Sequence, residues 1–389
     1  MKKEDVSGIV VYLLIMALAV LFGLNVLRAH YATSELGNYY FLFVIGAILV
    51  GVVFNAVIFE LAHRLGAKIG RYQVISTNIL GVLFYHEDKK LRVKFSGYDG
   101  LTGETKIVPI KDTKKEPNPS AYLWFGTLFY FVELLVSIIL FVFLNGDKMP
   151  VYAKNIGYFL LIVSVIGGMI LFYNILPLHL DSTTDGYRLT MVGNAANRKA
   201  FNELLRVEYE ISQGNSDVEI ATFTDITNFT ADLNLNKVYL LLDKRQYKEA
   251  EELLDIILNG KDTLSPKVYV RARAQKIYIN IISKSLEEAR VFYDEQVSMP
   301  ERREISNDLS MACIRTYLLM SGLLDKSRSE SMIAINNVNK GISRTPKQRR
   351  NIEISLFNEA LEKVSKLHPD WELDEYKVPL IVEKKEKKQ

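Results

Sequence analysis

Long apolar runs alternate with polar segments in the first half of the chain. No charged residue occurs at positions 9–27, 39–59 or 155–180, and the run 121–144 carries a single charge, Glu133. A helix needs roughly 20 consecutive apolar residues to cross the hydrocarbon core of a bilayer. The pattern therefore predicts four membrane spans, at about 9–29, 39–66, 121–144 and 155–178, and excludes an ordinary soluble protein.

The polar segment between the second and third predicted spans has the composition of a small sheet. Residues 72–112 are rich in Val, Ile, Phe and Tyr, and turn signals such as Ser96-Gly97 and Asp99-Gly100 separate the apolar stretches. We therefore expect a small β insertion here. With the four spans, it makes up a membrane domain covering residues 1–190.

The second half of the chain contains no run long enough to span a bilayer and has helical periodicity. Ala250 and Ala289 occupy matching positions in two amphipathic segments, where a small side chain lets a neighbouring helix approach closely. The pattern resembles a degenerate tetratricopeptide-type helical hairpin, and two unrelated amphipathic helices explain it equally well. The predicted architecture is thus an α-helical polytopic membrane domain, followed by a soluble all-α domain at 191–378 and a lysine-rich tail at 379–389.

The charge and the cysteine content limit which partners and which cellular compartment are expected. The net charge of +3 gives no reason to expect a nucleic-acid partner, and Cys313, the only cysteine, excludes an internal disulfide. Basic residues gather before the first span, between the second and third spans, and after the fourth. Because basic residues favour the cytoplasmic side, we predict a multi-pass cell-membrane protein with both termini in the cytoplasm and the lipid bilayer as its surroundings.

Polar residues inside predicted spans are candidate functional residues because they are costly in hydrocarbon. Glu60 and His63 lie near the end of the second span, three positions apart and so on one helix face. Asn174 and Pro177 lie at the end of the fourth span, and Glu133 lies in the middle of the third. The second and fourth spans run in the same direction, so their carboxyl ends share a leaflet and the first two groups can meet.

These residues resemble the two motifs of the site-2 protease family of intramembrane zinc metallopeptidases. The resemblance covers about residues 40–195 and rests on Glu60-Leu61-Ala62-His63, Asn174-Ile175-Leu176-Pro177 and Asp185-Gly186. It implies that Glu60 is a general base and that His63 and Asp185 are zinc ligands. Asp181 is a competing match for the motif aspartate. The resemblance also implies that the segment from Asn174 to Pro177 helps to bind the substrate.

One departure from the family pattern decides how much chemistry to expect. The first motif of the family is H-E-x-x-H, and Phe59 stands at the position of its first histidine. A catalytic zinc usually has three protein ligands and a water molecule. His179 is a candidate replacement ligand if the bend at Pro177 turns it inward, and Asp181 offers a further carboxylate.

The sequence leaves two functions open, one of them catalytic. In the favoured hypothesis the chain is a non-catalytic relative that binds a membrane-spanning peptide or partner protein and recruits a cytoplasmic protein through 191–378. In the alternative it is an intramembrane zinc metalloprotease with an altered ligand set. Zinc is its cofactor only in the alternative. Glu133 is predicted to pack the helices through a hydrogen bond, and a proton-linked transport role for it is a weaker third hypothesis.

Overall fold

The computed structural model is mostly helical and divides into two compact units, residues 1–218 and 219–389. It describes residues 13–14, 17–18, 21, 39–87, 90–96, 103–110, 115–177, 184–213, 215 and 218–381.

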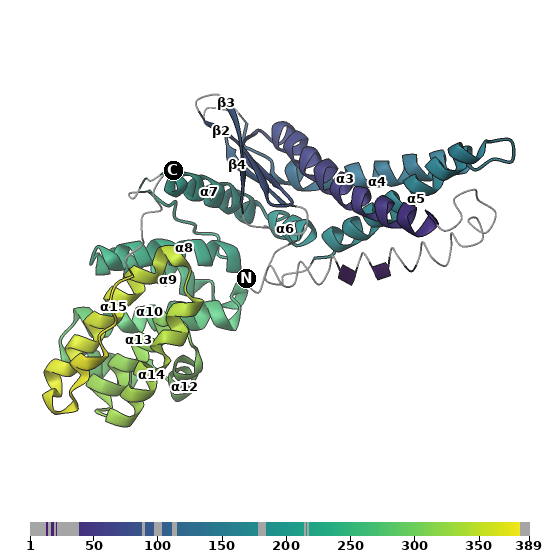
Figure 1. Cartoon of the computed structure of the whole chain (residues 1–389). Helices are drawn as coiled ribbons and strands as arrows, with labels where there is room; N and C mark the ends of the chain where they lie inside the picture. The colour runs from purple at the N-terminus through teal and green to yellow at the C-terminus, as the bar shows by residue number, and fades with distance from the viewer. Residues whose placement is uncertain are drawn as a thin grey trace. The chain divides into compact units, whose positions relative to one another are not determined.

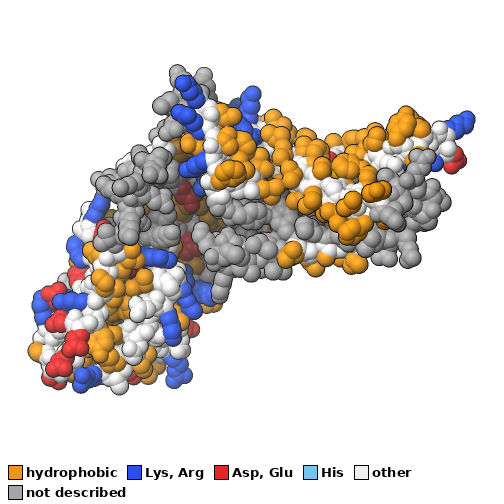
Figure 2. Space-filling model, in the orientation of Figure 1, with side chains coloured by type: hydrophobic (Ala, Val, Ile, Leu, Met, Phe, Trp, Pro, Cys, Tyr) orange, Lys and Arg blue, Asp and Glu red, His pale blue; other side chains and the backbone are white. Residues whose placement is uncertain are grey.

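Three helices of the first unit are long and apolar enough to cross a membrane: α3 (Tyr40–Ile69), α4 (Pro119–Leu144) and α5 (Val151–Ile175) (Figure 1). They pack against one another and correspond to the second, third and fourth predicted spans. The first predicted span, 9–29, lies almost entirely outside the described residues. Large apolar side chains cover the visible outer surface of the three helices, as expected where lipid replaces water (Figure 2).

A four-stranded antiparallel sheet lies in the chain between α3 and α4, as predicted. Its strands are β1 (Tyr72–Ile79), β2 (Val82–Glu87), β3 (Lys90–Phe95) and β4 (Gly103–Pro109), in the order β3-β2-β1-β4. The apolar stretch 73–85 forms two strands joined by a tight turn, with φ of 48° at Leu80 and 89° at Gly81. Two consecutive positive φ angles are typical of hairpin turns that match the twist of the strands.

Two further helices complete the first unit, α6 (Asp185–Val192) and α7 (Ala195–Ser212). The Tyr72 hydroxyl donates a hydrogen bond of 2.5 Å to Asn202 Oδ1, and Asn202 Nδ2 donates one of 3.2 Å to the Pro117 carbonyl. These bonds attach α7 to the first residue of β1 and to the residues just before α4, and α7 also contacts β4. Residues 191–212 therefore belong to the membrane unit, whereas the sequence placed them in the helical domain.

All regular secondary structure in the described residues of the second unit is helical. Its α-helices are α8 (Asn228–Asp243), α9 (Tyr247–Asn259), α10 (Pro266–Ser283), α11 (Leu286–Gln296), α12 (Met299–Asn307), α13 (Met311–Leu319), α14 (Arg328–Arg344) and α15 (Lys347–Leu367). Ala250 in α9 and Ala289 in α11 are both fully buried, and so are Leu254 and Tyr293 at the next matching positions. The two segments that the sequence paired are therefore buried alike at these two matching positions.

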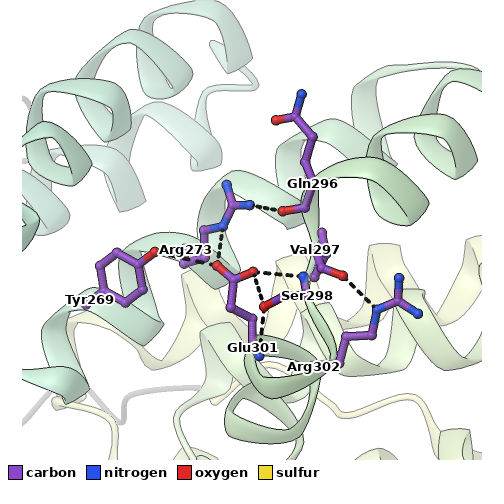
Figure 3. A network of polar contacts seen from close by, with 7 residues as sticks. All are labelled: Tyr269, Arg273, Gln296, Val297, Ser298, Glu301 and Arg302. Carbon is purple, nitrogen blue, oxygen red and sulfur yellow. Dashed lines mark hydrogen bonds and ion pairs between the residues drawn. The ribbon is translucent and has the colours of Figure 1, made fainter.

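A polar network fixes the start of α12 against α10 (Figure 3). The Ser298 backbone N–H and hydroxyl each donate a 2.9 Å hydrogen bond to Glu301 Oε2, which forms a capping box with the bond from Glu301 N–H to Ser298 Oγ. Arg273 of α10 forms an ion pair with the other carboxylate oxygen at 3.0 Å and also donates to the Gln296 carbonyl. One glutamate thus caps its own helix and anchors it to a neighbour.

The core of this unit contains a buried charge pair. Arg315 of α13 is fully buried, pairs with Glu353 of α15 and donates to Gln275 of α10. Its guanidinium lies 4.7 Å from the centre of the Tyr278 ring, a favourable position for a cation over an aromatic face. Because α15 also buries Phe357 and other apolar side chains, it is an integral part of the core.

Replacing Glu353 by alanine removes the partner of a buried charge, which costs about 3–5 kcal/mol. Cys313 precedes Arg315 in α13, and burial raises the pKa of its thiol to about 12. The thiol is therefore unreactive until the unit opens. We expect Glu353→Ala to accelerate alkylation of Cys313 by a maleimide roughly 10²–10⁴-fold, measured on the full chain by mass spectrometry.

The matched control for this prediction lies on the same helix. Glu362 forms an exposed ion pair with Lys366 one turn along α15, and such pairs contribute little to stability. Glu362→Ala should leave the alkylation rate close to that of the unaltered chain. Equal rates for the two variants would mean that the buried pair does not hold α13 and α15 together.

Candidate functional site

A buried polar cluster lies where the last turns of α3 meet β4, α4 and α6. Glu60 and His63 of α3 and Asp185 of α6 retain only 1%, 4% and 7% of their exposure. Charged and ionisable groups are seldom buried to this extent without partners. The contacts of each side chain therefore define what the cluster can do.

His63 and Asp185, far apart in the sequence, are in direct contact. His63 Nε2 lies 3.1 Å from Asp185 Oδ2, and His63 Nδ1 lies 3.3 Å from the Tyr122 carbonyl oxygen of α4. A protonated imidazole can donate from both nitrogens, to the carboxylate and to the carbonyl. A neutral imidazole that donates from Nδ1 to the carbonyl instead presents a free electron pair at Nε2, the arrangement found in metal-binding histidines.

Glu60 is held by the sheet. Thr105 of β4 donates a 2.6 Å hydrogen bond from its hydroxyl to Glu60 Oε2, and the Tyr122 hydroxyl donates to the Thr105 carbonyl at 3.0 Å. A hydrogen bond to a carboxylate is shorter and stronger than one between neutral groups. Thr105 and Tyr122 were not predicted from the sequence, since neither belongs to a recognisable motif.

The start of α6 is folded against the end of α5, which places Asp185. Thr184 accepts a hydrogen bond from the Tyr187 N–H as the helix cap and donates one of 2.5 Å to the Leu176 carbonyl. A Cβ on Gly186 would lie 2.2 Å from the Ile175 carbonyl oxygen, so only glycine fits there. Asp185 and Gly186 are the first two residues of α6.

The position of the missing motif histidine is filled by aromatic packing. The Phe59 ring lies edge-on to the His63 ring, with 4.4 Å between centres, and stacks on Tyr130 of α4 at 5.3 Å. Gly126 of α4 allows this approach, because a Cβ there would lie 2.9 Å from the Phe59 ring and 3.1 Å from His63 Nε2. An apolar side chain thus lies against the His63 imidazole, at the position in α3 where the site-2 protease motif has its first histidine.

The other predicted site residues have different surroundings. Asn174 is buried at the end of α5, and its Nδ2 has no hydrogen-bond partner among the described residues. Pro177 is exposed and follows the last turn of that helix. Glu133 accepts a 3.4 Å hydrogen bond from Ser137 within α4. His179 and Asp181 lie outside the described residues.

The donor set can be compared with that of a catalytic zinc. Two ligands at about 2.0–2.1 Å from a tetrahedral zinc lie roughly 3.3 Å apart, close to the 3.1 Å between His63 Nε2 and Asp185 Oδ2. Within the described part of the chain, however, no group of three His, Cys, Asp or Glu side chains converges as a metal site. These residues therefore supply two ligands where a catalytic zinc uses three, and the described set does not fit one.

Comparison with known proteins adds no relative to this picture. No model of a known protein family matches the chain, no curated protein is similar to it, and no solved structure matches its fold.

The close approach at Gly126 gives a test of the packing around the site. We expect Gly126→Ala to destabilise the membrane unit by about 1–3 kcal/mol, because the added methyl group overlaps the Phe59 and His63 rings. Thermal unfolding of the full chain in detergent measures the loss. Gly168→Ala in α5 is the control, since the nearest described atom to its Cβ is 3.9 Å away. If both variants melt alike, the α3–α4 contact at Phe59 is looser than described.

Proposed function

We propose that the chain is a non-catalytic relative of the site-2 proteases that binds a membrane-spanning peptide or partner protein. The observation that carries this proposal is the place of Phe59, whose ring packs between His63 and Tyr130 where the family has its first zinc-binding histidine. A side chain without lone pairs cannot bind zinc. Under this proposal the contact between His63 and Asp185 serves to join α3 to α6.

The binding function draws on groups at the end of α5. Asn174 Nδ2 is a buried donor with no acceptor among the described residues. A buried polar group is costly unless it is paired, so it favours a partner that brings a carbonyl oxygen. In the site-2 protease family the segment that corresponds to residues 174–177 helps to bind the substrate. This binding does not require a metal ion.

The membrane and helical units complete the proposed arrangement. We propose four spans, with both termini in the cytoplasm, and a tetratricopeptide-like array that recruits a cytoplasmic protein. The support for the array is the shared burial of Ala250 and Ala289 in α9 and α11. Because α15 packs on α13 within the core, a partner would use surfaces that α15 leaves accessible.

Metal content tests the non-catalytic proposal. We expect the purified full chain to contain no stoichiometric zinc by mass spectrometry. We expect Phe59→His to bind about one zinc per chain, because it restores the third ligand beside His63 and Asp185. Phe59→Leu is the matched control, since it changes the packing and adds no ligand.

The double variants decide whether restored zinc occupies this site. Zinc gained by Phe59→His should disappear when His63→Ala or Asp185→Ala is added. Stoichiometric zinc in the unaltered chain, lost on His63→Ala and on Asp185→Ala, would overturn the non-catalytic proposal.

That last outcome would favour a second candidate, an intramembrane zinc metalloprotease with an altered ligand set. The observation in its favour is the His63–Asp185 distance together with the contact of His63 Nδ1 with the Tyr122 carbonyl. Glu60 would then be the general base. We expect Glu60→Gln in that case to retain zinc and abolish cleavage of a transmembrane peptide, whereas His63→Ala would abolish both.

A further inference from the structure

A second polar cluster lies inside the packing of the three long helices, away from His63. Asn55 of α3 is fully buried, and Glu133 of α4 and Gly167 of α5 lie beside it. The point that a Cβ on Gly167 would occupy is 2.5 Å from Asn55 Oδ1 and 3.0 Å from Glu133 Oε2. Two oxygens from different helices therefore converge over one glycine of the third.

The orientation of the Asn55 amide is fixed by its own hydrogen bonds. Its Nδ2 donates to the Gly51 carbonyl at 2.8 Å and to the Val163 carbonyl at 3.0 Å. A flipped amide would place its oxygen against both carbonyls. The atom that faces the cluster is therefore the acceptor, Oδ1.

Neither of the converging oxygens receives a hydrogen bond from the described residues, although both atoms are buried. The Ser137 hydroxyl donates to the other carboxylate oxygen of Glu133, and the Tyr130 hydroxyl donates to the Asn55 carbonyl. The next ionisable side chain along α3 is Glu60, which Thr105 holds. Among the described residues, the remaining possible donor to either oxygen is therefore a proton carried by one of these two side chains.

The chemistry of the two side chains decides which one carries the donor proton. A carboxylate and an amide oxygen are both acceptors, whereas a carboxylic acid carries an O–H donor. An ionised side chain in the interior of a bilayer is also costly. We propose that Glu133 is protonated on Oε2 and donates a hydrogen bond from this O–H to Asn55 Oδ1. The junction of α3, α4 and α5 is then an intramembrane proton-binding site.

A bound metal ion is the competing occupant, and the geometry disfavours it. Hard cations such as Mg²⁺ and Ca²⁺ take about six or more oxygen ligands. Here Asn55 and Glu133 supply two oxygens, and Gly167 adds no side chain. The Asn55 and Glu133 side chains lie against the Gly167 backbone, so a Cβ there would meet both oxygens.

Infrared difference spectroscopy of the full chain in lipid nanodiscs at neutral pH tests the proposal. The spectrum of the unaltered chain minus that of Glu133→Gln should contain the carbonyl band of a protonated carboxylic acid. Asn55→Leu should shift this band to higher frequency, because the acid loses its acceptor. Ser137→Ala is the matched control, and it should shift the band less, since its contact with Glu133 is long at 3.4 Å.

Two results would overturn the proposal. Absence of the acid band shows that Glu133 is ionised, as a bound cation would require. An acid band whose frequency Asn55→Leu does not change shows that the acid does not donate a hydrogen bond to Asn55. If Asn55→Leu does not fold, thermal unfolding decides: Glu133→Gln, which keeps a donor to Oδ1, should match the unaltered chain, and Glu133→Leu should melt lower. Equal melting of these two variants contradicts the proposal.

Discussion

The contact between His63 and Asp185 is the interaction on which the arrangement of the membrane unit depends. His63 belongs to α3 and Asp185 to α6, and the sheet, α4 and α5 lie between them in the chain. Bringing these two side chains within 3.1 Å requires α5 to pack alongside α3 and Thr184, the cap of α6, to lie against Leu176 at the end of α5. In a medium without water, an ionisable side chain needs such a partner. The contact therefore joins α3 to α6, which are separated in the chain by the sheet, α4 and α5.

The sheet is held at the same polar cluster. Because Thr105 binds Glu60 and its own carbonyl accepts from Tyr122, β4 is fixed to α3 and α4 at one place. Position and register of the sheet are thereby linked to the polar end of α3. Any change that moves β4 along its neighbour β1 would withdraw the hydroxyl group from Glu60.

Much of the architecture could be predicted from the sequence, because apolar length and β-rich composition are local properties. The runs at 39–66, 121–144 and 155–178 correspond to α3, α4 and α5, and the insertion is a sheet. The contacts of Thr105 and Tyr122 could not be predicted, since they depend on the rotation of apolar helices and on strand register. Asn55 could have been noticed as an amide inside an uncharged span. Arg315 could not, because a charged residue outside the long apolar runs is expected at a protein's surface.

The order of the polar partners along the chain has a consequence for biosynthesis. Proteins are made from the amino end, and α3 is synthesised before β4, α4 and α6. Glu60 and His63 therefore reach the membrane before Thr105, Tyr122 and Asp185 exist to receive them. Until those segments emerge, the carboxyl end of α3 has to remain near the headgroups or be sheltered by the insertion machinery. A nascent chain stalled before α6 would keep the contact of His63 with the Tyr122 carbonyl and lack its carboxylate partner, Asp185.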